Sequence, residues 1–88
     1  MDLKIQDILL HPVLSEKALR LLESENKLVF IVHKKATKTQ IKQAFESLFN
    51  MKVEKVNTLV LPNGQKKAYI KVGKDYKASD ILSKMGLM

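Results

Sequence analysis

Residues 53–72 read VEKVNTLVLPNGQKKAYIKV, two alternating arms on either side of a short polar connection. β-Branched and aromatic residues recur in both arms, and an Asn-Gly pair between such arms favours a β-hairpin. Successive side chains of a strand point to opposite faces of its sheet. The second arm is therefore expected to have an apolar face and a basic face. The apolar face is Ala68, Ile70 and Val72, and the basic face is Lys67, Tyr69 and Lys71.

The sequence before the hairpin predicts two strands and a helix. Residues 8–14 are apolar and extended, but Pro12 cannot donate a ladder hydrogen bond, so a strand here is short or at a sheet edge. Ser15 is expected to cap a helix that ends at residues 23–26. Residues 27–33 form a strand whose interior is apolar on both faces, which indicates a central position with cover on each side.

Two more helices complete the expected order. Thr37 and Gln40 have the spacing of a capping box, at the start of a helix that ends near Asn50. Its core stripe is predicted to be Ile41, Ala44, Phe45 and Leu48. A last short helix is expected at residues 78–85, ended by Gly86, with Ile81, Leu82 and Met85 packed inward. The order predicts an α+β fold, a small and mainly antiparallel sheet of three to four strands with helices packed against it. We expect residues 1–88 to form a single domain.

The net charge of +7 is concentrated in the middle of the chain. Residues 27–74 carry eleven lysines and two glutamates, a balance of +9, whereas residues 1–26 carry three basic and five acidic side chains. A solvated surface normally mixes its signs, so this asymmetry predicts a polyanionic partner. All but one of the basic residues are lysine, whose compact charge suits phosphates better than base edges. The alternative is that the lysines only keep a small domain soluble.

These patterns predict an RNA-contacting surface on the hairpin and on the loop that enters the helix after Thr37. Tyr69 lies among lysines and can stack on a base, although packing within the sheet is an equal alternative. Asn57 and Thr58 interrupt an apolar arm with groups able to bond a phosphate or a 2′-hydroxyl, unless they mark a local bulge. The candidate RNA-binding residues are Lys17, Lys34, Lys35, Lys38, Lys42, Lys55, Asn57, Thr58, Lys66, Lys67, Tyr69 and Lys71.

Little in the sequence indicates an enzyme. The chain has no cysteine, and neither His11 nor His33 has a second ligand at a spacing suited to metal. Arg20 and Asn57 suggest the acyl-phosphate chemistry of some small α+β enzymes, but Arg20 lies inside an expected helix. We therefore predict no enzymatic activity, no catalytic residues, no metal, no cofactor and no small-molecule substrate.

Membrane and export signals are also missing from the sequence. The longest apolar run, residues 28–32, is far short of the roughly 20 residues that span a bilayer. The first residues lack a basic region followed by an apolar segment, so no signal peptide is expected. We expect a cytoplasmic location without membrane insertion.

Five blocks of the sequence, in order, resemble one known family. They are HPVLSEKA at 11–18, NKLVF at 26–30, ATK at 36–38, VEKVNT at 53–58 and KKAY at 66–69. Together they are similar to the universal large-subunit ribosomal protein L twenty-three family, over nearly the whole chain. Bacterial members insert a long basic loop between the hairpin arms, and eukaryotic members carry a long basic N-terminal extension. Because this sequence shows neither, it resembles the short archaeal form.

The resemblance implies a structural component of the large ribosomal subunit, bound to the third domain of large-subunit rRNA beside the polypeptide exit tunnel. It also implies neighbouring ribosomal proteins, L twenty-nine among them, and a docking site for the signal recognition particle or the nascent-chain-associated complex rather than trigger factor. Carried over, Leu14, Ser15 and Glu16 become the docking residues, and Lys66, Lys67 and Tyr69 face RNA. Two alternatives stay open, a free-standing single-strand RNA binder with stacked aromatics and a ligand-sensing or catalytic α+β module.

Overall fold

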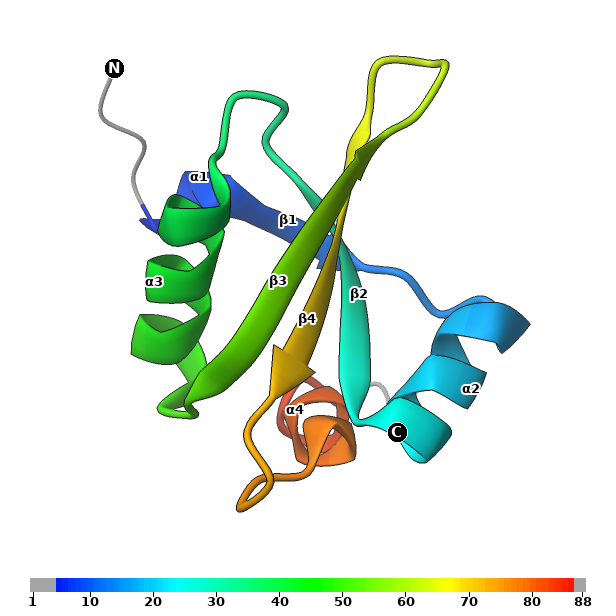
Figure 1. Ribbon diagram of the computed structural model, residues 1–88, viewed down its shortest axis with the longest axis vertical. Coiled ribbons are helices and arrows are strands. Elements are labelled where there is room, and N and C mark those ends of the chain that lie inside the picture. Colours follow the sequence, from blue (N-terminus) through cyan, green and yellow to red (C-terminus); the bar gives the residue numbers. More distant parts are fainter. Residues whose placement is uncertain (1–4, 87–88) are drawn as a thin grey trace.

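The computed structural model describes residues 5–86 as a four-stranded sheet with helices against it (Figure 1). The elements in chain order are α1 (Ile5–Ile8), β1 (Leu9–Pro12), α2 (Glu16–Glu25), β2 (Lys27–Val32), α3 (Lys38–Phe49), β3 (Val53–Val60), β4 (Lys66–Val72) and α4 (Ala78–Lys84). The strand order is β1-β2-β4-β3, and each neighbouring pair is antiparallel. The predicted α+β fold with an antiparallel sheet is confirmed.

The hairpin expected at residues 53–72 forms as strands β3 and β4. Val56 pairs with Ile70 and Asn57 with Tyr69, so the two arms are in regular register through their middle. The chain reverses where Gly64 adopts a φ of 90°, a left-handed conformation that favours glycine. The irregularity in β3 lies between Val53 and Lys55. The bulge considered at Asn57 and Thr58 is therefore absent from the described hairpin.

One face of the sheet, the inner face, is covered by α3 and α4 and forms the core. The core residues of the two central strands are Leu28, Phe30, Val32, Ala68, Ile70 and Val72. Phe30 meets Phe45 of α3 edge to face, with ring centroids 6.2 Å apart. Burying side chains of this size contributes about 1.5–3 kcal/mol each. Alternation along β2 and β4 therefore fixes which face of the sheet is buried.

The second face of β2 is also covered, as its continuous apolar run predicts. Val29 and Ile31 are only 4% and 6% exposed although they point away from the core. Val29 lies beside Ala18 and Leu21 of α2 in a small cleft. Figure 1 shows α3 and α2 on opposite sides of the sheet, with β2 between them. Because this face of β2 is covered, the part of the second face that stays open belongs to β4 and β3.

Both long helices begin and end where their capping residues predict. The Ser15 hydroxyl accepts a hydrogen bond from the Ala18 N–H at 3.2 Å at the start of α2. Thr37 and Gln40 form the predicted capping box of α3, with bonds of 3.0 and 3.2 Å. Asn50 closes α3 with a left-handed φ of 53°. These local signals confirm the predicted positions of α2 and α3.

Three local expectations are wrong. Residues 5–8 form the single turn α1, so the extended segment begins only at Leu9. Leu48 is 48% exposed, because the rings of Phe45 and Phe49 pack 4.9 Å apart and bring Phe49 inward instead. Met85 is 40% exposed, because α4 already ends at Lys84 and Met85 is its C-terminal cap.

Candidate nucleic-acid interface

The face of the sheet that turns away from the core is formed by alternate residues of β2, β4 and β3. We call it the outer face. Strand pairing arranges it in three rows, Lys27–Lys71–Lys55, Val29–Tyr69–Asn57 and Ile31–Lys67–Leu59. Directly opposite residues of an antiparallel pair have Cβ atoms about 4.5–5.5 Å apart. The outer face therefore gathers side chains that are up to 44 positions apart in the sequence, Lys27 and Lys71.

The first row places three lysines side by side across three strands. Lys27 and Lys55 each lie directly opposite Lys71, an arrangement of like charges that is unfavourable in an isolated sheet. Glu25 lies 3.2 Å from the Lys27 ammonium and Glu54 lies 3.9 Å from that of Lys71. Two carboxylates thus face four lysines once Lys67 of the third row is counted. The outer face is positive, and a polyanion would offset its repulsion.

Tyr69 occupies the centre of the outer face. Its neighbours across the strands are Val29 and Asn57. The ring is half-buried and lines the small cleft beside α2. Among residues 5–86 the aromatic pairs all join Phe30, Phe45 and Phe49 in the core, so Tyr69 has no aromatic neighbour on its own face. One aromatic among lysines does not form the platform of two or three rings on which single-strand binders stack bases.

Six of the predicted contact residues come together at the outer face. Five of them belong to the three rows described above, namely Tyr69, Lys67, Lys71, Lys55 and Asn57. Lys17 of α2 lines the cleft beside Lys67 and Tyr69, so it extends the same surface.

Lys66 and Thr58 point the other way. Thr58 pairs with the core residue Ala68, which places it on the inner face. The Lys66 ammonium donates a 2.6 Å hydrogen bond to the Ala36 carbonyl, in the loop that precedes α3. The resemblance groups Lys66 with Lys67 and Tyr69 as residues that face RNA, but adjacent strand residues point to opposite faces, so Lys66 does not share the outer face with Lys67.

The remaining predicted lysines form a separate basic region. They lie in the loop after β2 and on the first turns of α3, which packs on the inner face, and they are Lys34, Lys35, Lys38 and Lys42. All four are exposed. The predicted RNA-binding set is thus split between the outer face and this second basic region.

Comparisons with known proteins identify the family to which this chain belongs. The family model described as Ribosomal protein L23 matches residues 7–81. The chain belongs to this ribosomal protein family. It is also 57% identical over 76 residues to the large ribosomal subunit protein uL23 of Pyrobaculum aerophilum, covering 86% of this chain and 94% of that protein. The uL23 protein of Methanococcus aeolicus is 47% identical over 81 residues, which are 92% of this chain and 94% of that protein.

Membership in the ribosomal protein family gives the chain a structural role in the ribosome. Its members are structural proteins rather than enzymes, so the prediction of no enzymatic activity is confirmed. Arg20, which raised the question of catalysis, is an exposed α2 residue bonded to Glu16, whereas Asn57 lies on β3. Within residues 5–86 no three side chains are grouped to hold a metal ion. None of the described helices combines the length and apolar character needed to traverse a bilayer.

The residues to which the resemblance assigns factor docking lie at the start of α2, next to the cleft that borders the outer face. Leu14 is 43% exposed, and the Glu16 side chain is largely exposed and pairs with Arg20 at 3.0 Å. An exposed ion pair of this kind contributes little to stability and is easily exchanged for another partner. The Ser15 hydroxyl is already used as the helix cap. Leu14 and Glu16 are therefore the side chains of this segment left available for contact.

Lys27 is the outer-face residue that the sequence reasoning did not select. It begins β2 and completes the three-lysine row only because β2 pairs with β4 in the observed register. The alternation of Lys27, Val29 and Ile31 indicates one shared face, but the sequence alone does not say which strand lies beside it. Strand pairing was the missing signal.

Proposed function

We propose that this protein binds large-subunit rRNA through its outer face, as a ribosome-bound component of the cytoplasm. The family resemblance further suggests the third domain of that rRNA, beside the polypeptide exit tunnel. The observation that supports the proposal most strongly is the row Lys27–Lys71–Lys55, whose like charges stand directly opposite one another. Such a row costs stability in the free protein and is compensated when phosphates lie over it.

Each part of the outer face has a role in this proposal. Lys17, Lys55, Lys67 and Lys71 contact phosphates, together with Lys27. Asn57 offers an amide next to Tyr69, suited to a 2′-hydroxyl or a phosphate oxygen. Tyr69 is half-buried, and the exposed part of its ring is available for stacking on a base or ribose. The mixture of phosphate contacts and one stacking group fits recognition of a folded RNA by shape.

The second basic region is proposed to meet RNA as well, apart from the outer face. Lys34, Lys35, Lys38 and Lys42 have no carboxylate within ion-pair distance among the described residues. Lys66, whose ammonium bonds the Ala36 carbonyl, is proposed to position the loop of this region, and Thr58, on the inner face, is not among the proposed RNA contacts.

Titration of an isolated third-domain rRNA fragment tests the proposal. Neutralising about six phosphates predicts that log K falls with log salt at a slope of about −4 to −5. Lys67→Gln with Lys71→Gln should make this slope shallower by about 2, because two phosphate contacts are lost. Lys84→Gln, at an exposed residue of α4 away from the outer face, is the matched control and should leave the slope unchanged. Equal affinity for a random RNA duplex, or an unchanged slope in the double variant, would overturn the proposal.

We also propose that the start of α2 is the docking site for nascent-chain factors, the signal recognition particle or the nascent-chain-associated complex. Neighbouring ribosomal proteins such as L twenty-nine are proposed partners too. The exposure of Leu14 and Glu16 supports this role. Glu16→Arg should reduce co-sedimentation of the signal recognition particle with large subunits, whereas Asp80→Arg on α4 should not. Equal recovery with both variants would contradict this assignment.

A further inference from the structure

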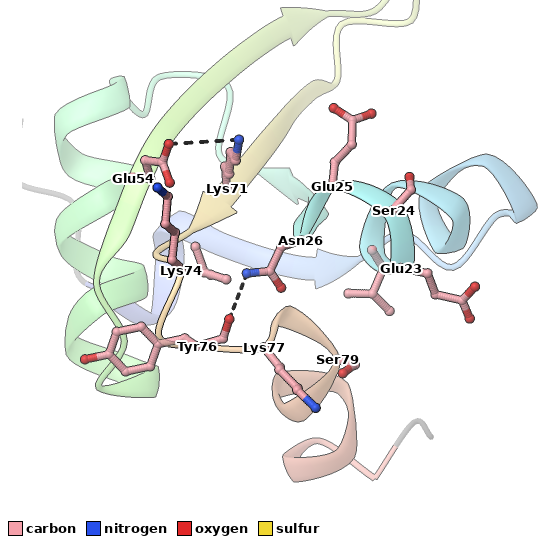
Figure 2. Close-up of a pocket in the computed structure, with 12 residues that line it drawn as sticks. Glu23, Ser24, Glu25, Asn26, Glu54, Lys71, Lys74, Tyr76, Lys77 and Ser79 are labelled. Carbon is pink, nitrogen blue, oxygen red and sulfur yellow. Dashed lines mark hydrogen bonds and ion pairs between the residues drawn. The ribbon is translucent and has the colours of Figure 1, made fainter.

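A groove lies at the end of the sheet away from the hairpin tip, next to the outer face (Figure 2). Its volume is about 690 Å³. The end of α2 forms one wall, the connection between β4 and α4 forms the other, and Glu54 and Lys71 stand where the groove meets the outer face. Nothing in the family's docking segment or in the proposed RNA contacts uses this groove, apart from Lys71.

The groove is electrically neutral in a protein whose net charge is +7. Three carboxylates and three ammonium groups line it, Glu23, Glu25, Glu54, Lys71, Lys74 and Lys77. Figure 2 shows Glu23 and Glu25 on the α2 wall, and Lys74 and Lys77 on the opposite wall. RNA in the groove would place phosphates against three carboxylates, and such like-charge contacts are unfavourable. The groove therefore marks where the RNA footprint ends.

The walls of the groove are held in place by one residue between them. Asn26 has a left-handed φ of 57° and ends α2. Its side-chain amide donates to the Tyr76 carbonyl at 2.8 Å, and its side-chain oxygen accepts from the Ala78 N–H at 2.7 Å. Figure 2 shows this amide at the junction of the two walls. A partner would thus bind a preformed groove and would pay little ordering entropy.

Half of the charged groups in the groove are unpaired. Glu25 is engaged with Lys27, and Glu54 with Lys71. Across residues 5–86, Glu23, Lys74 and Lys77 have no oppositely charged group within 4.0 Å. One carboxylate on one wall and two ammonium groups on the other are therefore free to recognise a partner that carries both signs of charge.

We infer that this groove docks a polypeptide segment of a neighbouring protein, with a lysine or arginine opposite Glu23 and a carboxylate opposite Lys74 and Lys77. The inference rests on the proposed function, because it assigns the outer face to RNA and the adjoining groove to protein. α2 connects the groove to Glu16, because Glu23 follows Glu16 on the same helix, which rises about 1.5 Å per residue. The groove and the docking segment thus form two ends of one protein-facing side.

Site-directed crosslinking tests the inference directly, because the natural sequence has no cysteine. Ser24→Cys places a single thiol at the α2 wall, and Asn57→Cys places one on the outer face. Each variant carries a benzophenone probe and is assembled into large ribosomal subunits before irradiation. We expect the probe at position 24 to crosslink a polypeptide and the probe at position 57 to crosslink rRNA.

Mass spectrometry of the product at position 24 then identifies the segment. A segment that carries both basic and acidic side chains supports the inference, and adding Glu23→Lys should lower its yield by roughly two- to fivefold. Crosslinking of position 24 to rRNA, to a segment of a single charge sign, or to nothing overturns the inference. Failure of position 57 to reach rRNA overturns the proposed function instead, so the two results are distinguishable.

Discussion

The two faces of β4 carry alternate residues of one short segment and are governed by different forces. Ala68, Ile70 and Val72 point inward and are almost fully buried, whereas Lys67, Tyr69 and Lys71 point outward and keep part of their surface in solvent. The inner face is determined by burial of apolar area, which stabilises the free protein. The outer face holds repelling charges that contribute little or negatively to stability until a polyanion covers them. Substitutions on the two faces should therefore separate stability from RNA binding.

The largest effect is expected on the inner face. Ile70→Ala removes a fully buried side chain from the centre of the sheet and should lower the free energy of unfolding by about 2–5 kcal/mol. Urea unfolding of the free protein measures this loss as a lower midpoint. The control variant is Lys71→Ala, at the next residue of β4, which points outward. Its free energy of unfolding should change by no more than about 0.5 kcal/mol. Comparable losses in both variants would mean that the outer face also belongs to the core.

The next effect is expected at the centre of the outer face. Tyr69→Ala removes the stacking ring and should weaken binding of the rRNA fragment by about 1–3 kcal/mol. Fluorescence anisotropy at fixed salt measures the loss. Tyr69→Phe serves as the control, because it keeps the ring and should retain most of the affinity. If Tyr69→Ala instead reduced stability as much as Ile70→Ala while leaving RNA affinity intact, the ring would be a packing residue.

A smaller effect separates Lys66 from Lys67. Lys66→Met breaks the hydrogen bond to Ala36 and should cost about 0.5–1.5 kcal/mol of stability, with little change in RNA affinity. Lys67→Met should do the reverse, because its ammonium lies on the outer face. Thermal unfolding and the RNA titration, run on both variants, give four values. Weakened RNA binding by the Lys66 variant alone would show that the alternation along β4 has been assigned the wrong way.

The smallest effect tests the three-lysine row itself. Lys55→Gln removes one like charge opposite Lys71 and should raise the stability of the free protein by about 0.2–0.5 kcal/mol at low salt. The gain should disappear at high salt, where exposed charges are screened. Lys84→Gln, outside the row, is the control. A loss of stability on Lys55→Gln would mean that the row is not a site of repulsion.

Features encoded within a few neighbouring residues were predictable from the sequence. The hairpin follows from alternation around Asn63-Gly64, and the helix starts follow from Ser15 and Thr37. The central position of β2 follows from its apolar run. The chain's membership of a ribosomal protein family was predictable as well, because five short blocks occur in the family's order.

Features that depend on contacts between distant residues were not predictable. Lys27 joins the outer face only through its register with Lys71, and the bond of the Lys66 ammonium to the Ala36 carbonyl joins residues 30 positions apart. Phe49 replaces Leu48 in the core, where its ring centroid lies 6.4 Å from that of Phe30 on β2. The neutral groove depends on the two hydrogen bonds by which the Asn26 side chain holds the β4–α4 connection against the end of α2. Each of these needs the sheet order, which no local pattern in the sequence contains.

Differential lysine labelling in the ribosome tests the assignment of the outer face most directly. The free protein and intact large subunits are treated with an amine-acetylating reagent, and mass spectrometry compares each lysine between the two samples. Lys55, Lys67 and Lys71 should react in the free protein and be strongly protected in the subunit, because rRNA covers the outer face. Equal labelling of these three lysines in both samples would contradict the claim that this face lies on RNA.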